Sequence, residues 1–199
     1  MCDCDNDKKT DSEVKEAQVD YNRRYTYSDY VKWDDEERWE LIDGVPYLMS
    51  APGRRHQKML GNLYLQFGNF LKGKKCEVYF APFAVRLNAD TLDDTVVQPD
   101  LVVICDHEKL DTTGCAGAPD LAVEVLSPST SRHDRVIKFD KYLEAGIREY
   151  WIIDPETKTL AANILNNSKY ITHLYTGKDK APVHILEGFS VDLSEVFEE

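Results

Sequence analysis

The strongest constraint on the fold is a pair of acidic residues, each embedded in a short apolar run of the kind that forms buried strands. Glu124 lies inside the run PDLAVEVL at 119–126, and Asp100 lies inside the run VVQPDLVVI at 96–104. An ionised carboxylate among Val, Ile and Leu is costly, so such residues are usually paired with a cation or bind a metal. The sequence therefore predicts two strands whose acids face a positive charge.

The order Pro99, Asp100, then Glu124 on a later strand resembles the PD-(D/E)xK nuclease superfamily, in which an Asp and a Glu from neighbouring strands hold a divalent metal beside a Lys. The wider sequence is similar to the bacterial family of "putative restriction endonucleases" within that superfamily, from about Tyr25 to the C-terminus. The resemblance rests on residues 25–30, 39–44, 55–57, 81–87, 98–103, 123–130 and 146–154. It implies an α/β fold with a restriction-endonuclease-like mixed central sheet flanked by helices.

The chain departs from the superfamily pattern at Leu126, where a Lys would stand two residues after the Glu. In the resembling family a Lys on the following helix serves instead, and residues 131–134 resemble a capping box that begins a helix over 131–145. At 100° per residue, Lys138 lies at the edge of an apolar arc, whereas Lys141 faces away from it. We therefore expect Lys138 to supply the missing cation; the alternative is a surface pair with Asp134. The arc consists of Val136, Phe139, Tyr142 and Leu143.

Two further acids bear on the site. Superfamily members often supply an additional N-terminal Glu, which makes Glu40 a candidate, although an exposed residue on a hairpin strand is about as good an interpretation. Asp120 also follows a Pro and shares the face of Glu124, so it is a second candidate for the Asp of the motif. We prefer Asp100, because Asp120 lies at the end of a strand where solvent stabilises a carboxylate.

If Asp100 and Glu124 are metal ligands, their oxygen donors select Mg²⁺ or Mn²⁺. The resemblance then implies a metal-dependent endonuclease that hydrolyses phosphodiester bonds with metal-activated water. Leu126 supports an alternative, a catalytically degraded nuclease fold that acts as a nucleic-acid-binding or scaffolding module. A hydrolase of small phosphoesters is a third interpretation, and a purely structural ion pair at Glu124 is a fourth.

The net charge of −12 argues against a protein that coats nucleic acid without specificity. The charge is unevenly distributed, because residues 51–76 contain six basic residues and no acid. We expect nucleic acid, DNA in the first place, to contact the start of the helix at 54–72; ordinary solvated charges are the alternative. The candidate contacts are Arg54, Arg55, His56 and Lys58.

Residues 1–23 are too polar to form a core and are expected to be a disordered acidic tail, with residues 24–199 as a single nuclease domain. Without a signal-peptide pattern or an apolar run near ~20 residues, the chain is expected to be cytoplasmic and not membrane-bound. The five cysteines, an odd number, favour reduced thiols, with Cys76 as a small buried residue. A zinc site at Cys105, His107 and Cys115 lacks a fourth ligand and is disfavoured.

Cutting both strands of a duplex needs two active sites, which favours a homodimer, as relatives in the superfamily commonly form. Four aromatic residues near the N-terminus were the expected interface, on the assumption that they are exposed: Tyr25, Tyr27, Tyr30 and Trp33. The periodicity and turn signals also predict a short helix from Thr26 to about Glu37. The other expected elements are a hairpin at 39–49 turning at Asp43-Gly44, a helix at 54–72, strands at 76–87, 96–104, 121–126 and 149–154, a hairpin at 160–175, and a closing segment at 185–193.

Overall fold

The structure is a computed structural model that describes residues 19–33, 37–127 and 133–198. Most of the expected acidic tail at 1–23, and residues 131 and 132 of the expected capping box, lie outside these ranges. The disordered tail and the single domain at 24–199 therefore stay predictions.

The main sheet has six strands and is mixed. Only β8 and β9 run parallel within it, and the other neighbouring pairs are antiparallel. The predicted mixed sheet is thus confirmed. In spatial order the strands are β11 (Lys169–Thr176), β10 (Thr159–Asn166), β9 (Glu149–Asp154), β8 (Leu121–Val125), β6 (Leu101–Ile104) and β3 (Glu77–Phe80).

A second sheet, which the sequence did not predict as a separate unit, has five short strands. It contains the predicted hairpin at its edge, and Asp43 and Gly44 both have positive φ, at 50° and 73°. These values match the two left-handed residues of a type I′ turn. The strands in spatial order are β2 (Val45–Met49), β1 (Arg38–Ile42), β5 (Val96–Val97), β4 (Ala84–Arg86) and β7 (Gly114–Ala116), and a separate pair consists of β12 (Lys180–Pro182) and β13 (Ser190–Asp192).

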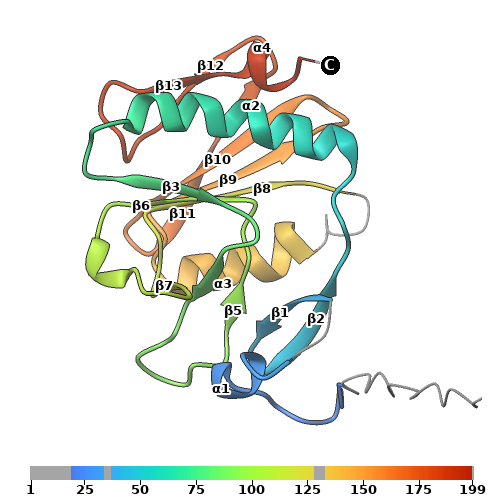
Figure 1. Cartoon of the computed structure of the whole chain (residues 1–199). Helices are drawn as coiled ribbons and strands as arrows, with labels where there is room; N and C mark the ends of the chain where they lie inside the picture. Colours follow the sequence, from blue (N-terminus) through green and yellow to red (C-terminus); the bar gives the residue numbers. More distant parts are fainter. Residues whose placement is uncertain (1–18, 34–36, 128–132, 199) are drawn as a thin grey trace, which may run out of the picture.

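Helices lie on both faces of the six-stranded sheet (Figure 1). The long helix α2 (Arg54–Leu71) lies on one face together with α4 (Leu193–Val196), and α3 (Phe139–Glu144) lies on the other. The predicted apolar period of α2 is confirmed, since Met59, Leu60, Leu63, Phe67 and Leu71 are its buried residues. Alternate residues of the central strands enter the two cores: Leu101 and Val123 pack on the α2 side, Val102 and Ala122 on the α3 side.

Two strands predicted as continuous are broken, each at a proline. The run at 76–87 divides into β3 and β4 at the cis peptide bond Ala81-Pro82. The run at 96–104 divides into β5 and β6 at Pro99, and the two halves belong to different sheets. Proline lacks the N–H that a central strand needs, so the chain leaves one sheet and enters the other there. Asp100 therefore lies at a crossing between the two sheets.

The helix predicted at 131–145 is present in its described part, but it begins as a π-helix, η2 (His133–Lys138), and continues as α3. A π-turn holds more residues than an α-turn, so the 100° phase does not apply along its whole length. Val136 was expected in the apolar arc and is 53% exposed instead, whereas Tyr142 is buried as expected. Lys138 is also buried, so the prediction that it faces inward is confirmed.

The first helix is shorter than predicted, and its aromatics do not form an exposed face. The helix α1 covers only Tyr27–Tyr30, and the Asp29 carboxylate accepts the Thr26 N–H at 3.1 Å, as in a capping box. Tyr25 is buried, and Tyr27, Tyr30 and Trp33 pack around it in a small core with Leu41 and Val96. The expectation that all four rings are exposed was therefore wrong, because Tyr25 is buried and the other three are partly buried where they attach the N-terminal segment to the second sheet.

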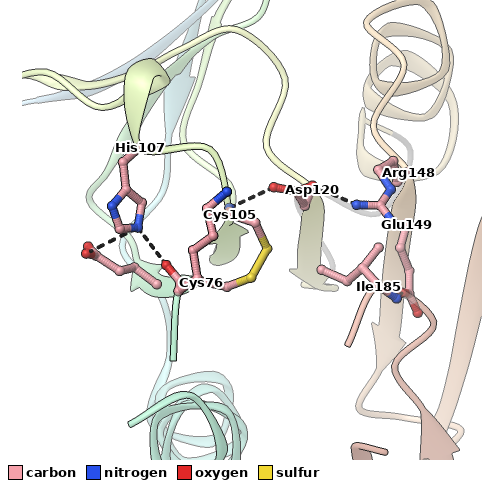
Figure 2. The surroundings of a disulfide bond; sticks show 9 residues. Cys76, Cys105, His107, Asp120, Arg148, Glu149 and Ile185 are labelled. Carbon is pink, nitrogen blue, oxygen red and sulfur yellow. Dashed lines mark hydrogen bonds and ion pairs between the residues drawn. A yellow bond between two sulfur atoms is a disulfide. The ribbon is translucent and has the colours of Figure 1, made fainter. Parts of the chain in front are cut away.

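The cysteines were predicted to be reduced, and for two of them the prediction was wrong. Cys76 and Cys105 form a disulfide between the ends of β3 and β6 (Figure 2). The register of this strand pair places Glu77 opposite Ile104, so the next residues outward, Cys76 and Cys105, face each other. Cys115 is free and buried.

The helices in the described ranges include none with the length and apolar character to cross a bilayer.

Candidate active site

The two acids that the sequence singled out lie at the same end of the β6–β8 pair. Leu101 of β6 is opposite Val123 of β8, so Asp100 and Glu124, the residues next to this pair, are close neighbours. The Val125 N–H donates to Asp100 Oδ2 at 2.7 Å, which ties the residue before β6 directly to β8. The sheet register thus brings together two carboxylates that lie far apart in the sequence.

Lys138 reaches this pair from the helix on the opposite side of the cluster. Its Nζ lies 2.8 Å from Glu124 Oε1 and 2.8 Å from Glu40 Oε1. Its Nζ also lies 3.6 Å from Oδ1 of Asp134, four residues earlier in the chain. The Tyr142 hydroxyl donates to the same Glu124 Oε1 at 2.8 Å. The helix therefore presents three buried polar side chains, Asp134, Lys138 and Tyr142, to the strand that carries Glu124.

Glu40 joins the cluster from the second sheet. It lies on β1 and is buried, so the alternative of an exposed hairpin residue was wrong. Its Oε1 accepts the backbone N–H of Gln98 at 2.7 Å in addition to its contact with Lys138. The structure therefore brings all four predicted catalytic candidates together: Glu40, Asp100, Glu124 and Lys138.

Burial and the excess of acids set the protonation of this cluster. Burial raises the pKa of Glu124 well above its ordinary value; Lys138 acts in the opposite direction, and Asp134, Asp100 and Glu40 add to the rise. For Lys138 burial lowers the pKa, but Glu124, Glu40 and Asp134 outweigh it, so the pKa of Lys138 lies well above its ordinary value. The ammonium of Lys138 therefore keeps its proton, and the buried Glu124 carboxyl among three other acids is harder to ionise than an exposed one.

A cavity of about 390 Å³ opens onto the cluster. One wall is the segment that leads from β2 into α2, residues 47–53. The ionisable residues that line it are Arg38, Glu40, His56, Asp100, Glu124, Asp134 and Lys138. The predicted site residues thus share one solvent-accessible space.

The donor set fits a hard divalent cation. Asp100 Oδ2 and Glu124 Oε1 carry the contacts given above, whereas Asp100 Oδ1 and Glu124 Oε2 have no partner within the described ranges. Two free carboxylate oxygens suit Mg²⁺ or Mn²⁺, which bind through one or two carboxylates and keep several waters. Among the described residues, no group of three or more His, Cys, Asp or Glu side chains is arranged so that it could hold a metal ion.

The residues predicted to contact nucleic acid at the start of α2 do not all lie at the cavity. His56 faces the cavity, and its Nε2 lies 3.0 Å from Asp100 Oδ2. Burial lowers the pKa of His56, but the hydrogen bond and the charge of Asp100 outweigh it and raise the pKa overall. Arg55 binds Glu156 at 2.9 Å and the Pro155 carbonyl at 2.8 Å. Arg54 and Lys58 line a separate pocket of about 250 Å³ with Glu198.

Asp120, the second candidate for the motif Asp, lies at the other end of β8. Its Oδ2 accepts the Cys105 N–H at 2.8 Å, and its Oδ1 pairs with Arg148 at 2.9 Å (Figure 2). It does not line the cavity. The geometry therefore favours Asp100 as the residue that acts with Glu124.

Sequence reasoning missed part of the site. Asp134 was considered only as a surface partner of Lys138, and Tyr142 only as an apolar residue, but both are buried against the cluster. The spacing of Asp134, Lys138 and Tyr142, four residues each, was a usable signal, because it places three polar groups on one helical face. No comparable spacing in the sequence indicated Arg38, which also lines the cavity.

The chain is similar to known proteins in sequence and in fold. The chain is 34% identical over 131 residues to an uncharacterized protein of Synechocystis sp., a match that covers 65% of this chain and 67% of the relative. A crystal structure from Anabaena variabilis, described as a "putative nuclease belonging to DUF820", superposes with a TM-score of 0.71 at 17% identity, covering 87% of this chain and 97% of that one. At this identity the superposition shows a shared fold.

The sequence profile of the family described as "putative restriction endonuclease" matches residues 27–194. This range includes both sheets, the helix that carries Lys138 and every residue of the acidic cluster. The chain therefore belongs to the "putative restriction endonuclease" family.

Proposed function

We propose that the protein is a metal-dependent endonuclease that hydrolyses phosphodiester bonds of nucleic acid at the cavity of Asp100 and Glu124. The observation that carries the proposal is the position of Lys138. The chain lacks the Lys that should follow Glu124 in sequence, and the helix delivers an ammonium to 2.8 Å from the same carboxylate. The ammonium thus completes the set of two acids and a lysine that the superfamily resemblance implies, which supports an active site over a degraded one.

Asp100 and Glu124 would hold Mg²⁺ or Mn²⁺ through Oδ1 and Oε2. The bound ion would lower the pKa of a water and offset the negative charge that develops on the phosphate. Within the chain, the Val125 N–H and His56 Nε2 fix the Asp100 carboxylate by binding Oδ2. Lys138 and the Tyr142 hydroxyl fix Glu124 in the same way by binding Oε1.

The raised pKa of Lys138 supports a role as a fixed charge over one as a general base. A general base must give up its proton near neutral pH, and this ammonium keeps it. Lys138 therefore acts as a fixed positive charge that stabilises the anionic transition state and orients Glu124 and Glu40.

Three finer expectations belong to this proposal. DNA is the substrate we favour, because the family description refers to restriction endonucleases. A cytoplasmic location is retained with it, although a disulfide such as Cys76–Cys105 is uncommon in a reducing cytosol. A homodimer follows from the need to cut two strands, although one of the aromatics first expected at its interface is buried and the other three are partly buried.

The proposal is tested by calorimetric titration of Mn²⁺ into the wild type, Asp100→Asn and Glu124→Gln, together with single-turnover cleavage of a mixed pool of DNA and RNA. We expect the wild type to bind the ion and cleave, and both variants to lose binding and activity. Glu187→Gln, a change at an exposed acid outside the cavity, serves as the control and should match the wild type. Equal Mn²⁺ affinity in the wild type and both site variants would refute the proposal.

A further inference from the structure

Arg38 differs from the other cations of the cavity in having no carboxylate partner. Three basic side chains line the cavity, and two of them bind its acids: Lys138 contacts Glu40 and Glu124, and His56 contacts Asp100. The contacts of Arg38 within the described ranges go to the neutral amide of Gln98 alone. Its positive charge is therefore not cancelled by an ion pair.

The hydrogen bonds of Arg38 leave one side of the guanidinium open. Nε and Nη2 both donate to Gln98 Oε1, at 3.2 Å and 2.9 Å. A guanidinium has five N–H donors, so about three remain, on Nη1 and Nη2. These two nitrogens form the planar fork that binds a phosphate through two parallel hydrogen bonds.

The orientation of this fork is fixed before any ligand arrives. The Gln98 amide nitrogen donates to the Tyr30 hydroxyl at 2.9 Å and to the Trp39 carbonyl at 3.1 Å, so the amide oxygen must face Arg38. The backbone N–H of Gln98 binds Glu40 Oε1 at 2.7 Å. Gln98 therefore links the position of Arg38 to the acidic cluster.

Arg38 also lies on the correct side of the second sheet. Residues two apart on a strand point to the same face, so Arg38 and Glu40 of β1 both face the cavity that they line. The cavity otherwise presents four carboxylates, which repel an anionic substrate unless a cation offsets them. A rigid, uncancelled guanidinium at this place is suited to hold such a substrate.

We infer that Arg38 binds a backbone phosphate of the nucleic acid next to the bond that is cut. This inference rests on the proposed function and adds a substrate-binding residue to it. The competing interpretation is that Arg38 only supports Gln98, through a structural hydrogen bond between β1 and the segment that joins β5 to β6.

The test measures binding without cleavage, in buffer that contains Ca²⁺. Fluorescence anisotropy reports the binding at several salt concentrations. The probes are a labelled DNA duplex, the matching RNA duplex and single-stranded DNA. For Arg38→Gln we expect about 10-fold weaker binding to the preferred probe, the effect of losing a charged hydrogen bond. The slope of log affinity against log salt should fall by about 0.9 on duplex DNA or about 0.7 on a single strand. Arg38→Lys, which keeps the charge and loses the fork, should keep the slope and recover part of the affinity.

Arg148→Gln is the matched control, an exposed arginine outside the cavity, and should leave the slope unchanged. Thermal melts of every variant separate lost binding from lost folding. An unchanged salt slope for folded Arg38→Gln, or a wild type that binds none of the probes, overturns the inference. If Arg38→Gln shows the wild-type slope while the wild type binds Mn²⁺ and cleaves, the inference fails and the proposed function stands. If the slope falls but the wild type never cleaves, Arg38 binds a backbone phosphate, and the proposed function fails together with the position next to a cut bond.

Discussion

Both ends of the β6–β8 strand pair carry an aspartate, and the surroundings of the two aspartates differ. At one end Asp100 and Glu124 face the cavity, and Glu124 is buried with Lys138. At the other end Asp120 binds the Cys105 N–H and pairs with Arg148, whose side chain is 59% exposed. Both aspartates follow a proline, at 99 and 119, and both border a strand of the main sheet.

The comparison shows what distinguishes a site from a structural ion pair. At the Asp120 end each charge is solvated or satisfied, and a disulfide links the end of β6 to the start of β3, so the arrangement serves stability. At the cavity end the acids outnumber the bases, burial raises the pKa of Glu124, and two carboxylate oxygens have no described partner. That arrangement is unfavourable for stability unless a cation is bound, which is typical of a functional site.

The largest expected effect is the loss of Lys138. Lys138→Met removes the charge that stabilises the transition state, so cleavage should fall by about 10²–10⁴-fold. It also leaves buried carboxylates unpaired, which should lower the free energy of unfolding by about 3–5 kcal/mol. Single-turnover cleavage and guanidinium denaturation measure the two effects.

The control for this prediction is Lys141→Met on the same helix. Lys141 pairs with Asp43 and Glu144, which are largely exposed, so its loss should cost only about 0–1 kcal/mol and leave cleavage unchanged. A dead Lys141→Met, or a Lys138→Met that cleaves at the wild-type rate, would show that the placement of the migrated lysine is wrong.

The second prediction concerns the disulfide at the opposite end. Cys76 and Cys105 are 29 residues apart, and closing a loop of this size restricts the unfolded chain enough to contribute about 3–4 kcal/mol. The double variant Cys76→Ser, Cys105→Ser should therefore lose about that much stability, measured by denaturation without reductant.

Cleavage at low temperature should change less than roughly twofold in this double variant, since neither sulfur lies at the cavity. Adding reductant should destabilise the wild type to the level of the variant and leave the variant unaffected. A wild type that is insensitive to reductant would mean that the bond does not form in solution.

Much of this architecture follows from local patterns in the sequence. The period of α2, the Asp43-Gly44 turn and the apolar runs around Asp100 and Glu124 each depend on residues that are neighbours in the chain. The helix carrying Lys138 was also predicted. The expectation that the Lys138 side chain faces inward is confirmed, although Val136 of the expected apolar arc is exposed.

The parts that could not be predicted depend on contacts between distant segments. Cys76 and Cys105 meet only because β3 and β6 pair in one register, which spacing alone does not reveal. Glu40 reaches Lys138 because β5 and β6 separate at Pro99 and enter different sheets. The sequence suggested which residues are chemically unusual, and tertiary pairing decides which of them share a cavity.

The third prediction is a gain of stability at the cavity end. In Glu124→Gln the amide oxygen can still accept from Lys138 and Tyr142, while the amide nitrogen takes the place of Oε2 toward the cavity. Because the folded-state pKa of Glu124 is raised, the wild type loses stability as pH rises from the ordinary value of 4.5 through the raised value. The variant lacks this loss and should be about 1–2 kcal/mol more stable in metal-free buffer at neutral pH, or roughly 2–8 °C in Tm.

Saturating Mn²⁺ should reverse the order, because only the wild type gains stability from binding the ion. Melts at pH 5 and pH 8, with and without Mn²⁺, check both statements. A variant less stable than the wild type in metal-free buffer at pH 8 would mean that Lys138 fully compensates the buried carboxylates.

The smallest expected effect is that of Asp120→Asn, the change that compares the two Pro-Asp positions directly. The amide can still accept the Cys105 N–H, and the lost pair with Arg148 is largely exposed, so the free energy of unfolding should fall by only about 0.2–1 kcal/mol. Mn²⁺ affinity and cleavage should match the wild type, whereas Asp100→Asn should lose both. The reverse result, with activity lost at Asp120 and kept at Asp100, would move the site to the disulfide end of the strands and overturn the assignment built on the cavity.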